Sequence, residues 1–534
     1  MPATTTDHHP HVLPFDADVA PSRDLLGGKG SSLVRMVGLG LPVPPGFVLT
    51  TDVGRAWLAD EALPAGVPEA VRDRLAALEA TLGRRLGDPG DPLLLSVRSG
   101  APVSMPGMMD TVLNVGLNDE VVAALAQRTG DARFAWGSYA RLLESYATVV
   151  RGLAAADVED ALFDVVAHDP AERARETAQA LLALLERAGA PFPADPRTQV
   201  TECLEAVFRS WRSPRAEAYR EHRGIDAALG TAAIVQSMVF GNRGATSGSG
   251  VAFSRDPATG EPGAYGDVLF DAQGEDVVAG TADPDPLTLL AERLPELHAR
   301  LLDVLATLER EAGDLVECEF TIEEGRLWVL QFRPAQRSGR AAVRVAVDLV
   351  DEGVLDAGAA VALVSDEHLA AAGAPRFASA APDDHVVARG AAASPGAATG
   401  VAVFDAGRAQ ERAAAGERVV LVRPTTSPAD VHGFIAAAGI VTGRGGRTSH
   451  AAVVARGMGR PAVCGVGAVE VAADRRSATL DGAPLREGDA LAVDGDRGIV
   501  ARVAPPLADA DADARLERVH RWRAAAGTTA TVRA

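Results

Sequence analysis

The chain of 534 residues has little cysteine, few aromatic side chains and no long apolar run. Its three cysteines lie far apart and without metal-site spacing, so neither a disulfide framework nor a zinc site is indicated. No stretch approaches the roughly 18 consecutive apolar residues of a membrane span, and the first residues lack the basic and apolar regions of a secretory signal. These absences predict a soluble cytoplasmic protein with no membrane partner.

Basic charge is also scarce. The chain has 52 Lys and Arg residues against 72 Asp and Glu residues, which gives a formal net charge of −20. An excess of this sign argues against a surface that binds nucleic acid or anionic membrane. An anionic ligand must therefore be held by a few local cations and backbone amides.

The length exceeds what one hydrophobic core usually organises, so two or three domains are expected. The apolar patterning predicts a multidomain protein of mixed α+β and α/β class. Residues 20–115 read as strands joined by tight loops, and the aromatic stripe that follows them reads as core packing of a helical block. In order, we expect a mobile tail (1–20), a first domain (21–340) with a helical block (117–230), a helical Ala-rich linker (341–391), a compact α/β domain (392–504), and a linker with a helix (505–534).

The most informative segment is GIVTGRGGRTSHAAVVARGMGRPAVCG, residues 439–465. A β-like run enters a Gly-rich turn, and Thr448 or Ser449 then caps a helix that holds His450 in its first turn. Unpaired backbone N–H groups at a helix N-terminus stabilise a phosphoryl group, and neutral imidazole is a suitable nucleophile for phosphorus. Arg456 is a candidate clamp for the transferred oxyanion. Taken alone, however, such a histidine is more often a structural residue.

Two isolated cations stand beside small residues in the N-terminal part: Lys29 in GGKG and Arg98 in SVRSG. Glycine allows the backbone to approach phosphate oxygens closely, so both cations suit a phosphate contact. The Gly/Ser-rich turn 241–250 lies between two β-like runs and could fold over a triphosphate. Taken one at a time, the two cations are more often surface charges, and the turn is only a hairpin loop.

Acidic and polar residues alternate on two later strands. Glu317 and Glu319 flank Cys318, and Gln331 and Arg333 repeat the spacing, so each pair shares a strand face. Magnesium prefers hard oxygen ligands next to phosphates, and an arginine adds positive charge for the transition state. A solvated strand face with a cross-strand ion pair is the alternative.

Longer strings resemble a known family. TSHAAVVARGMGRPAV resembles the signature of the phosphohistidine domain of PEP-utilising enzymes, which include pyruvate phosphate dikinase, phosphoenolpyruvate synthase, enzyme I of the sugar phosphotransferase system and rifampicin phosphotransferase. LLGGKGSSLVRMVGLGLPVPPGF, SVRSGAPVSMPGMMDTVLNVGLND, VQSMVFGNRGATSGSGVAFSRDPATGE and EFTIEEGRLWVLQFR look like pyruvate phosphate dikinase, in that family's order. Together the resemblance covers nearly the whole chain.

The resemblance implies an ATP-grasp nucleotide-binding domain with a helical insert, followed by a swivelling phosphohistidine β/β/α domain. It implies that Mg²⁺ is bound by Glu319 and Gln331, although Glu317 stands where the family usually has Asp. For the nucleotide it implies a set of contact residues: Lys29, Arg98, Gln236, Ser237, Met238, Val239, Gly248, Gly250, Glu275 and Arg333. The strand Gln236–Val239 would bond the adenine edge, and Thr448, Ser449 and Arg456 would support His450.

The reaction implied is a pyrophosphorylation of His450 by ATP with release of AMP. Orthophosphate then takes the terminal phosphoryl group, leaving pyrophosphate and phosphohistidine for transfer to pyruvate. The family's C-terminal barrel takes about 250 residues, whereas 30 residues follow position 504. We therefore expect the chain to stop before that barrel, and a separate PEP/pyruvate-binding barrel protein to be its partner. Whether the chain forms a homodimer stays open.

Three other interpretations stay open. The phosphohistidine could serve another acceptor, or water could replace orthophosphate as in the synthase. The chain could be a non-catalytic ATP-binding regulator, or it could be an excised piece. Local departures from the dikinase pattern include Thr425 in place of an acidic residue and Arg447 in place of Met, and Thr448 matches a position that is phosphorylated in some relatives.

Overall fold

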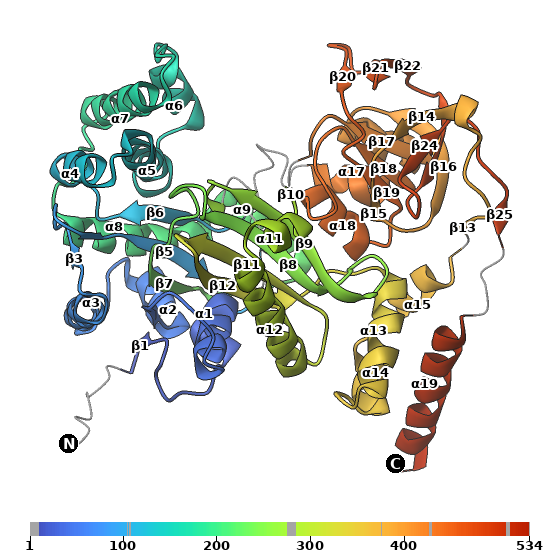
Figure 1. The fold of residues 1–534 in the computed structure, drawn as a ribbon, viewed down its shortest axis with the longest axis horizontal. Coiled ribbons are helices and arrows are strands. Elements are labelled where there is room, and N and C mark those ends of the chain that lie inside the picture. The colour runs from blue at the N-terminus through green and yellow to red at the C-terminus, as the bar shows by residue number, and fades with distance from the viewer. Residues whose placement is uncertain are drawn as a thin grey trace. The chain divides into compact units, whose positions relative to one another are not determined.

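The computed structural model describes residues 10–103, 105, 108–274, 285–374, 376–426, 430–508 and 513–532 (Figure 1). The chain divides into two compact units. The first unit comprises Met1–Arg243 and Trp328–Gln331, and the second comprises Gly244–Leu327 and Phe332–Ala534. The boundary after Arg243 falls inside the predicted domain 21–340, whose limits stay a prediction.

A five-stranded sheet forms the centre of the first unit, in the order β1-β2-β7-β5-β6. All of its neighbouring strands are antiparallel. Its strands are β1 (Val12–Pro14), β2 (Gly46–Leu49), β5 (Leu95–Gly100), β6 (Thr111–Val115) and β7 (Ala232–Ser237), and a separate short pair is β3 (Arg85–Leu86) with β4 (Pro92–Leu93). Central strand β7 is buried along its whole length, as its apolar sequence requires.

Three helices cover sequence that the patterning assigned to strands and loops: α1 (Arg23–Gly38), α2 (Thr51–Asp60) and α3 (Val67–Leu82). The expectation of strands is confirmed for β2 and β5 but is wrong for these segments. In α1 the reason is the glycine content of GGKG, which disfavours an isolated helix. Gly27 has φ 68°, and the helix is kinked there. Packing against the rest of the unit stabilises α1 where intrinsic propensity does not.

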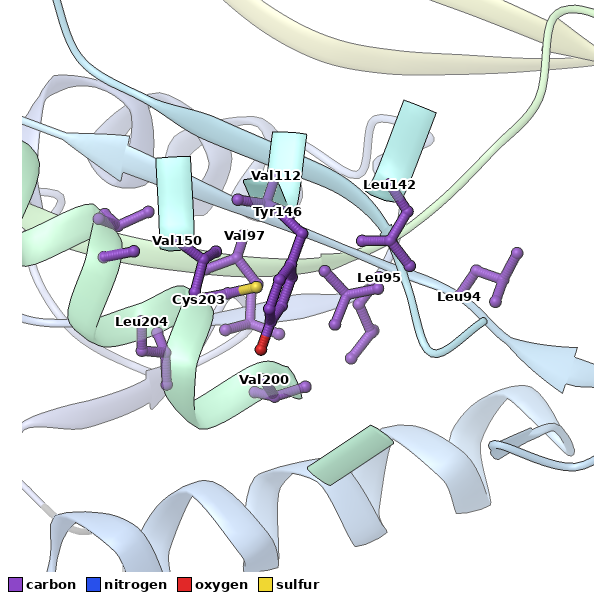
Figure 2. Packing of buried hydrophobic residues seen from close by; sticks show 14 of the residues in the cluster. Leu94, Leu95, Val97, Val112, Leu142, Tyr146, Val150, Val200, Cys203 and Leu204 are labelled. Carbon is purple, nitrogen blue, oxygen red and sulfur yellow. The ribbon is translucent and has the colours of Figure 1, made fainter. Parts of the chain in front are cut away.

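Most of the range 117–230, the expected helical block, is helical. It contains a π-helical turn at Tyr146–Val150 and the helices α4 (Asp119–Thr129), α5 (Ala132–Ser145), α6 (Ala155–Leu162), α7 (Pro170–Arg187), α8 (Pro196–Arg209) and α9 (Pro214–Arg223). Tyr139 and Tyr146 are buried, so the aromatic stripe is core, as predicted. Figure 2 shows the Tyr146 ring beside the Cys203 sulfur, among Val97, Val150 and Val200. This core joins the helical block to the sheet.

A second five-stranded sheet has the order β10-β9-β8-β11-β12, and it belongs to the second unit except for Trp328–Gln331 of β12. Strand β8 pairs antiparallel with both β9 and β11. The elements are β8 (Gly248–Arg255), β9 (Pro262–Phe270), β10 (Asp285–Pro286), α11 (Thr288–Arg293), α12 (Pro295–Ala312), β11 (Val316–Glu323) and β12 (Arg326–Pro334). Three helices follow in the predicted Ala-rich linker: α13 (Gly339–Asp351), α14 (Ala357–Ala362) and α15 (Asp366–Ala372).

An eight-stranded sheet then follows, in the order β14-β24-β23-β16-β17-β18-β19-β15. Four neighbouring strands of this sheet, β16, β17, β18 and β19, are parallel. Val419 and Leu421 belong to one core cluster and Val420 and Val422 to another, so alternate side chains of β17 fill both faces of the sheet. The elements are β14 (Val386–Arg389), β15 (Ala391–Ser394), β16 (Ala397–Val403), α16 (Ala406–Ala414), β17 (Val419–Arg423), α17 (Val431–Ala436), β18 (Gly439–Thr442), α18 (His450–Gly457), β19 (Ala462–Cys464), β23 (Ala490–Asp494) and β24 (Ile499–Ala501).

The remaining elements are peripheral to this sheet. A small sheet contains β20 (Val469–Val471), β21 (Ser477–Leu480) and β22 (Ala483–Arg486), and a two-stranded ribbon pairs β13 (Arg376–Phe377) with β25 (Leu507–Ala508). The expected C-terminal helix is present as α19 (Ala514–Val532). None of the described helices combines the length and the apolar character needed to cross a membrane.

Candidate functional site

His450 lies at the carboxyl edge of the parallel strands of the second unit. β17 ends at Arg423 and β18 at Thr442, and these two residues are register partners. Helices α17 and α18 begin beyond these strand ends, and the two helices pack against each other. Open parallel sheets bind ligands at the carboxyl ends of their strands. The topology therefore places the start of α18, where His450 lies, at an edge suited to a ligand.

Ser449 is the N-cap of α18, and its hydroxyl oxygen accepts a hydrogen bond from the Ala452 N–H at 3.4 Å. This settles which of the two hydroxyl residues caps the helix, and the interpretation of Thr448 as the cap is wrong. The Thr448 hydroxyl instead donates to the Asp267 carboxylate on β9. Burial raises the pKa of Asp267, and the bond from Thr448 opposes that rise.

The His450 imidazole is partly buried, and its Nε2 atom has no hydrogen-bond partner among the residues that the structure describes. Burial lowers the pKa of His450 below its ordinary value, while the nearby Asp430 carboxylate raises it less strongly. Asp430 is itself buried at the start of α17 and pairs with the Arg423 guanidinium at 3.4 Å. The net effect favours a neutral imidazole at neutral pH, which is the nucleophilic form.

Arg456 does not extend into solvent. It is 2% exposed, and its Nη1 atom donates to the carbonyl oxygens of Ala393 at 2.8 Å and Arg447 at 2.7 Å. In this structure the guanidinium binds one main-chain carbonyl of the turn that precedes His450 and one on strand β15. Its role as an oxyanion clamp stays a prediction.

In the first unit, the GGKG segment packs against the end of β5. The Gly28 N–H donates to the Ala101 carbonyl at 2.8 Å. A Cβ on Gly27 would lie 1.6 Å from the Gly100 carbonyl oxygen, so only glycine fits there. Lys29 follows directly on α1, and Arg98 lies two residues before Gly100 on β5. The fold therefore positions both predicted phosphate-binding cations from one helix–strand contact.

Arg98 also contacts the predicted adenine-binding strand. Its guanidinium donates to the Gln236 side-chain oxygen, and the Gln236 amide donates to the Pro44 carbonyl at 2.9 Å. Beyond the strand, the Met238 N–H donates to the Leu94 carbonyl at 2.8 Å. Gln236 and Ser237 are on β7, and Met238 and Val239 follow it.

Lys29 carries a signal that the motif analysis missed. It is the only lysine in the printed sequence, whereas every other residue among the 52 Lys and Arg is arginine. An ammonium group is a compact point charge with freely rotating donors, whereas a guanidinium is a planar fork. The contact of Lys29 with phosphate stays a prediction.

Glu317 and Arg333 form an ion pair across strands β11 and β12. The Glu317 carboxylate accepts from Arg333 Nη2 at 2.7 Å, while its second oxygen is buried without a hydrogen-bond partner in the described part of the chain. Burial alone would lower the pKa of Arg333, but Glu317 raises it above its ordinary value. The interpretation as a cross-strand ion pair thus holds for these two residues. The unbonded buried oxygen also fits a position close to a hard cation.

The other predicted ligands are placed as follows. Glu319 is partly buried on β11, and Gln331 is partly buried on β12, the neighbouring strand in the sheet order. Among the described residues, no group of three or more His, Cys, Asp or Glu side chains is arranged to hold a metal. The assignment of Glu319 and Gln331 as magnesium ligands stays a prediction.

The two glycines of β8 have a packing reason. A Cβ on Gly250 would lie 2.5 Å from the Asp267 carbonyl oxygen and 2.5 Å from the Phe320 ring, and one on Gly248 would lie 3.0 Å from the Leu269 carbonyl oxygen. Both glycines let β9 and β11 approach β8 closely, independent of any nucleotide. Glu275 lies outside the described residues.

Two family descriptions match the chain. Residues 56–302 match "Pyruvate phosphate dikinase, AMP/ATP-binding domain", and residues 415–498 match "PEP-utilising enzyme, mobile domain". The second match contains β17, β18, the turn and His450. The chain is therefore similar, over these residues, to an AMP/ATP-binding domain and, further along, to a mobile domain of the PEP-utilising type.

Individual relatives carry more specific names than the two family descriptions. The chain is similar to the pyruvate, phosphate dikinase of Rhizobium meliloti (strain 1021), with 44% identity over 94% of this chain and 58% of the relative. It is 41% identical to the enzyme of the same name from Clostridium symbiosum, over 96% of this chain and 60% of the relative. It is 45% identical to the chloroplastic pyruvate, phosphate dikinase 1 of Oryza sativa subsp. japonica, over 94% of this chain and 54% of the relative. The chain thus spans little more than half the length of these relatives.

Proposed function

We propose that this chain is a pyruvate phosphate dikinase-like phosphotransferase in which ATP and orthophosphate charge His450. The observation that carries the proposal is the position of His450. It starts helix α18 at the carboxyl edge of the parallel strands, and burial lowers the pKa of its imidazole. The similarity to pyruvate, phosphate dikinases over 94% of the chain supports it.

In the first step, a nitrogen of neutral His450 attacks the β-phosphorus of ATP. The new N–P bond forms as the bond between the β-phosphorus and the α,β-bridging oxygen breaks, and AMP leaves with that oxygen. The N-terminal amides of α18 face the developing charge and stabilise it. His450 then carries a pyrophosphoryl group.

In the second step, an oxygen of orthophosphate attacks the terminal phosphorus of that group. The bond to the bridging oxygen breaks, pyrophosphate leaves, and one phosphoryl group stays on His450. Pyruvate, which the relatives' name includes, is the proposed final acceptor, and the product would be phosphoenolpyruvate. A separate PEP/pyruvate-binding barrel is the proposed partner for that transfer.

The nucleotide would be bound by residues of an ATP-grasp fold. Lys29 and Arg98 are proposed to contact phosphate oxygens, and the main chain of residues 236–239 to bind the adenine edge. Glu319 and Gln331 would hold Mg²⁺, which supplies positive charge to the phosphate oxygens when bound. Arg333 would add a further charge, with Glu317 fixing its orientation at 2.7 Å.

A swivelling of the phosphohistidine domain is part of the proposal. The predicted hinges are 375–396 and 504–513, of which Pro375 and residues 509–512 lie outside the described residues. Arg376 and Phe377 of the first hinge pair antiparallel with Ala508 and Leu507 of the second. Two connections that run side by side support rotation about one place rather than two.

The test is incubation of the pure chain with ATP labelled at the β- or γ-phosphate, Mg²⁺ and orthophosphate. We expect AMP and an acid-labile phosphoenzyme that His450→Asn abolishes. A γ-label retained on the protein until orthophosphate is added would identify the pyrophosphoryl intermediate. Equal labelling of His450→Asn would overturn the proposal.

The same experiment separates the alternatives. Turnover without orthophosphate would indicate that water attacks, as in phosphoenolpyruvate synthase. Binding of ATP with no exchange of isotope between ATP and AMP would indicate a non-catalytic regulator. Release of label to another acceptor, but not to pyruvate with an added barrel protein, would indicate a different phosphotransferase.

A further inference from the structure

Arg456 is a buried charged side chain directly beneath the proposed catalytic turn. It is 2% exposed and lies on α18, six residues after His450. Burial lowers the pKa of Arg456, but a guanidinium stays charged throughout the physiological range. The chain therefore holds a full positive charge inside the domain, at the level of the phosphohistidine turn.

A single nitrogen of this side chain joins three segments. Helical side chains point toward the N-terminus of their helix, so Arg456 reaches back past the start of α18. Its Nη1 atom donates to the Arg447 carbonyl in the turn at 2.7 Å and to the Ala393 carbonyl on β15 at 2.8 Å. Helix α18 itself packs on β15 and β19. The guanidinium therefore ties the turn that presents His450 to a strand of the sheet.

The remaining donors of Arg456 are unused. Its Nε and Nη2 atoms are buried without a hydrogen-bond partner in the described chain. A buried charge whose N–H groups lack hydrogen-bond partners contributes little to stability, because removing the charge from water is unfavourable. An apolar side chain of similar volume often stabilises a protein as much. Stability alone does not explain an arginine at this position.

We propose that Arg456 is a positioning residue for phosphotransfer: it fixes the Arg447 carbonyl, and with it the turn 443–449, so that His450 is held for in-line attack. This inference rests on the proposed function. It differs from an oxyanion clamp because Arg456 acts on main-chain carbonyls and does not touch the phosphoryl group. A displacement of about 1 Å at a reacting group is enough to cost on the order of 100-fold in rate.

The test compares Arg456→Met with the wild type in single-turnover labelling by ATP. Methionine keeps the unbranched apolar stem and removes the donors. We expect the maximal rate of phosphoenzyme formation to fall about 10- to 100-fold. The half-saturating ATP concentration and the unfolding midpoint should stay close to wild type. Free guanidinium at non-denaturing concentration should restore part of the rate in Arg456→Ala, because the vacated space matches it.

Arg418→Met is the matched control. The Arg418 side chain also donates to a main-chain carbonyl, that of Thr399 at 3.1 Å, but it lies at the amino end of β17, opposite the His450 edge. Its labelling rate should equal that of the wild type. Arg456→Lys keeps the charge but loses the planar fork of donors. If the geometry of the donors is decisive, its labelling rate should be lower than that of Arg456→Ala with added guanidinium.

The outcomes separate this inference from the proposed function. If the wild type is not labelled, the proposed function fails. If the wild type is labelled and Arg456→Met is labelled at the same rate, the positioning role is overturned. A rate loss that matches only the loss of folded protein, without guanidinium rescue, would reduce Arg456 to a structural residue. A rise in the half-saturating ATP concentration at unchanged maximal rate would instead indicate a clamp on the substrate.

Discussion

At the scale of single residues, Lys29 has the clearest chemical requirement. It is the only lysine in the sequence and lies two residues after Gly27, where a Cβ would lie 1.6 Å from the Gly100 carbonyl oxygen. A guanidinium is larger and binds phosphate as a planar fork, so Lys29→Arg should not replace it. We expect phosphoenzyme formation to fall at least about 10-fold, a difference of about 1.4 kcal/mol.

An amine-acylating reagent offers an independent measurement. With one lysine, the reagent should modify a single side chain, identified by peptide mass spectrometry, and ATP should slow that modification. The α-amino group, if it is free, serves as the internal control. Full activity of Lys29→Arg, or acylation that ATP does not affect, would contradict the role.

The pKa of His450 gives a second prediction at this scale. Burial lowers it below the ordinary value of 6.5, and Asp430 partly offsets this effect. The pH at which labelling falls to half its maximal rate should therefore lie below 6.5. Asp430→Asn removes the opposing charge, so the decline should shift to still lower pH, provided that this variant keeps its fold.

The sign of the linkage to stability follows from the same shift. A depressed histidine pKa means that the unfolded state binds the proton more readily than the folded state. The unfavourable contribution of His450 is therefore absent above the unfolded pKa and grows as pH falls through it. NMR titration of the imidazole in wild type and Asp430→Asn measures both pKa values. A His450 pKa above 6.5 in the wild type would refute the prediction.

At the scale of elements, helix α1 tests whether packing or propensity decides local structure. Gly27 has φ 68°, and its Cβ would overlap the Gly100 carbonyl, whereas a Cβ on exposed Gly38 in the same helix meets nothing within 4 Å. Gly27→Ala should destabilise the protein by about 1–3 kcal/mol through overpacking and backbone strain. Gly38→Ala should stabilise it by about 0.5–1 kcal/mol.

Urea unfolding of both variants gives the measurement. The two changes are chemically identical and lie 11 residues apart in one helix. The difference between their effects on the free energy of unfolding therefore reports the contact of Gly27 with β5. Equal effects of the two substitutions would show that this contact does not decide the conformation at GGKG.

At the scale of the whole molecule, the proposal requires that one polypeptide both binds ATP and carries the histidine that ATP charges. Covalent tethering raises the effective concentration of one domain at the other. Labelling should therefore be first order and independent of protein concentration. Mixing Lys29→Met with His450→Asn should restore little labelling, because neither chain holds both functional parts. Efficient restoration in the mixture would indicate transfer between chains.

The sequence predicted the local structure around His450, because the evidence for that structure is local. The Gly-rich turn, the hydroxyl cap and the histidine are consecutive, so their position at the start of α18 follows from turn and capping chemistry. The strands β16, β17, β18, β19 and β23 follow from their short apolar runs. Helix α1 was missed because its glycines disfavour a helix and only contacts with distant residues stabilise it.

The sequence by itself determined which chemistry is available: a histidine that starts a helix, a lysine in GGKG, and carboxylates in alternation on a strand. The tertiary structure alone decided what each side chain contacts. It buried Arg456 on two carbonyls, brought Asp430 near His450 from the neighbouring strand end, and paired Glu317 with Arg333. The physical reason is range: capping and turn preferences act over a few residues, whereas burial and ion pairing depend on segments that only folding brings together.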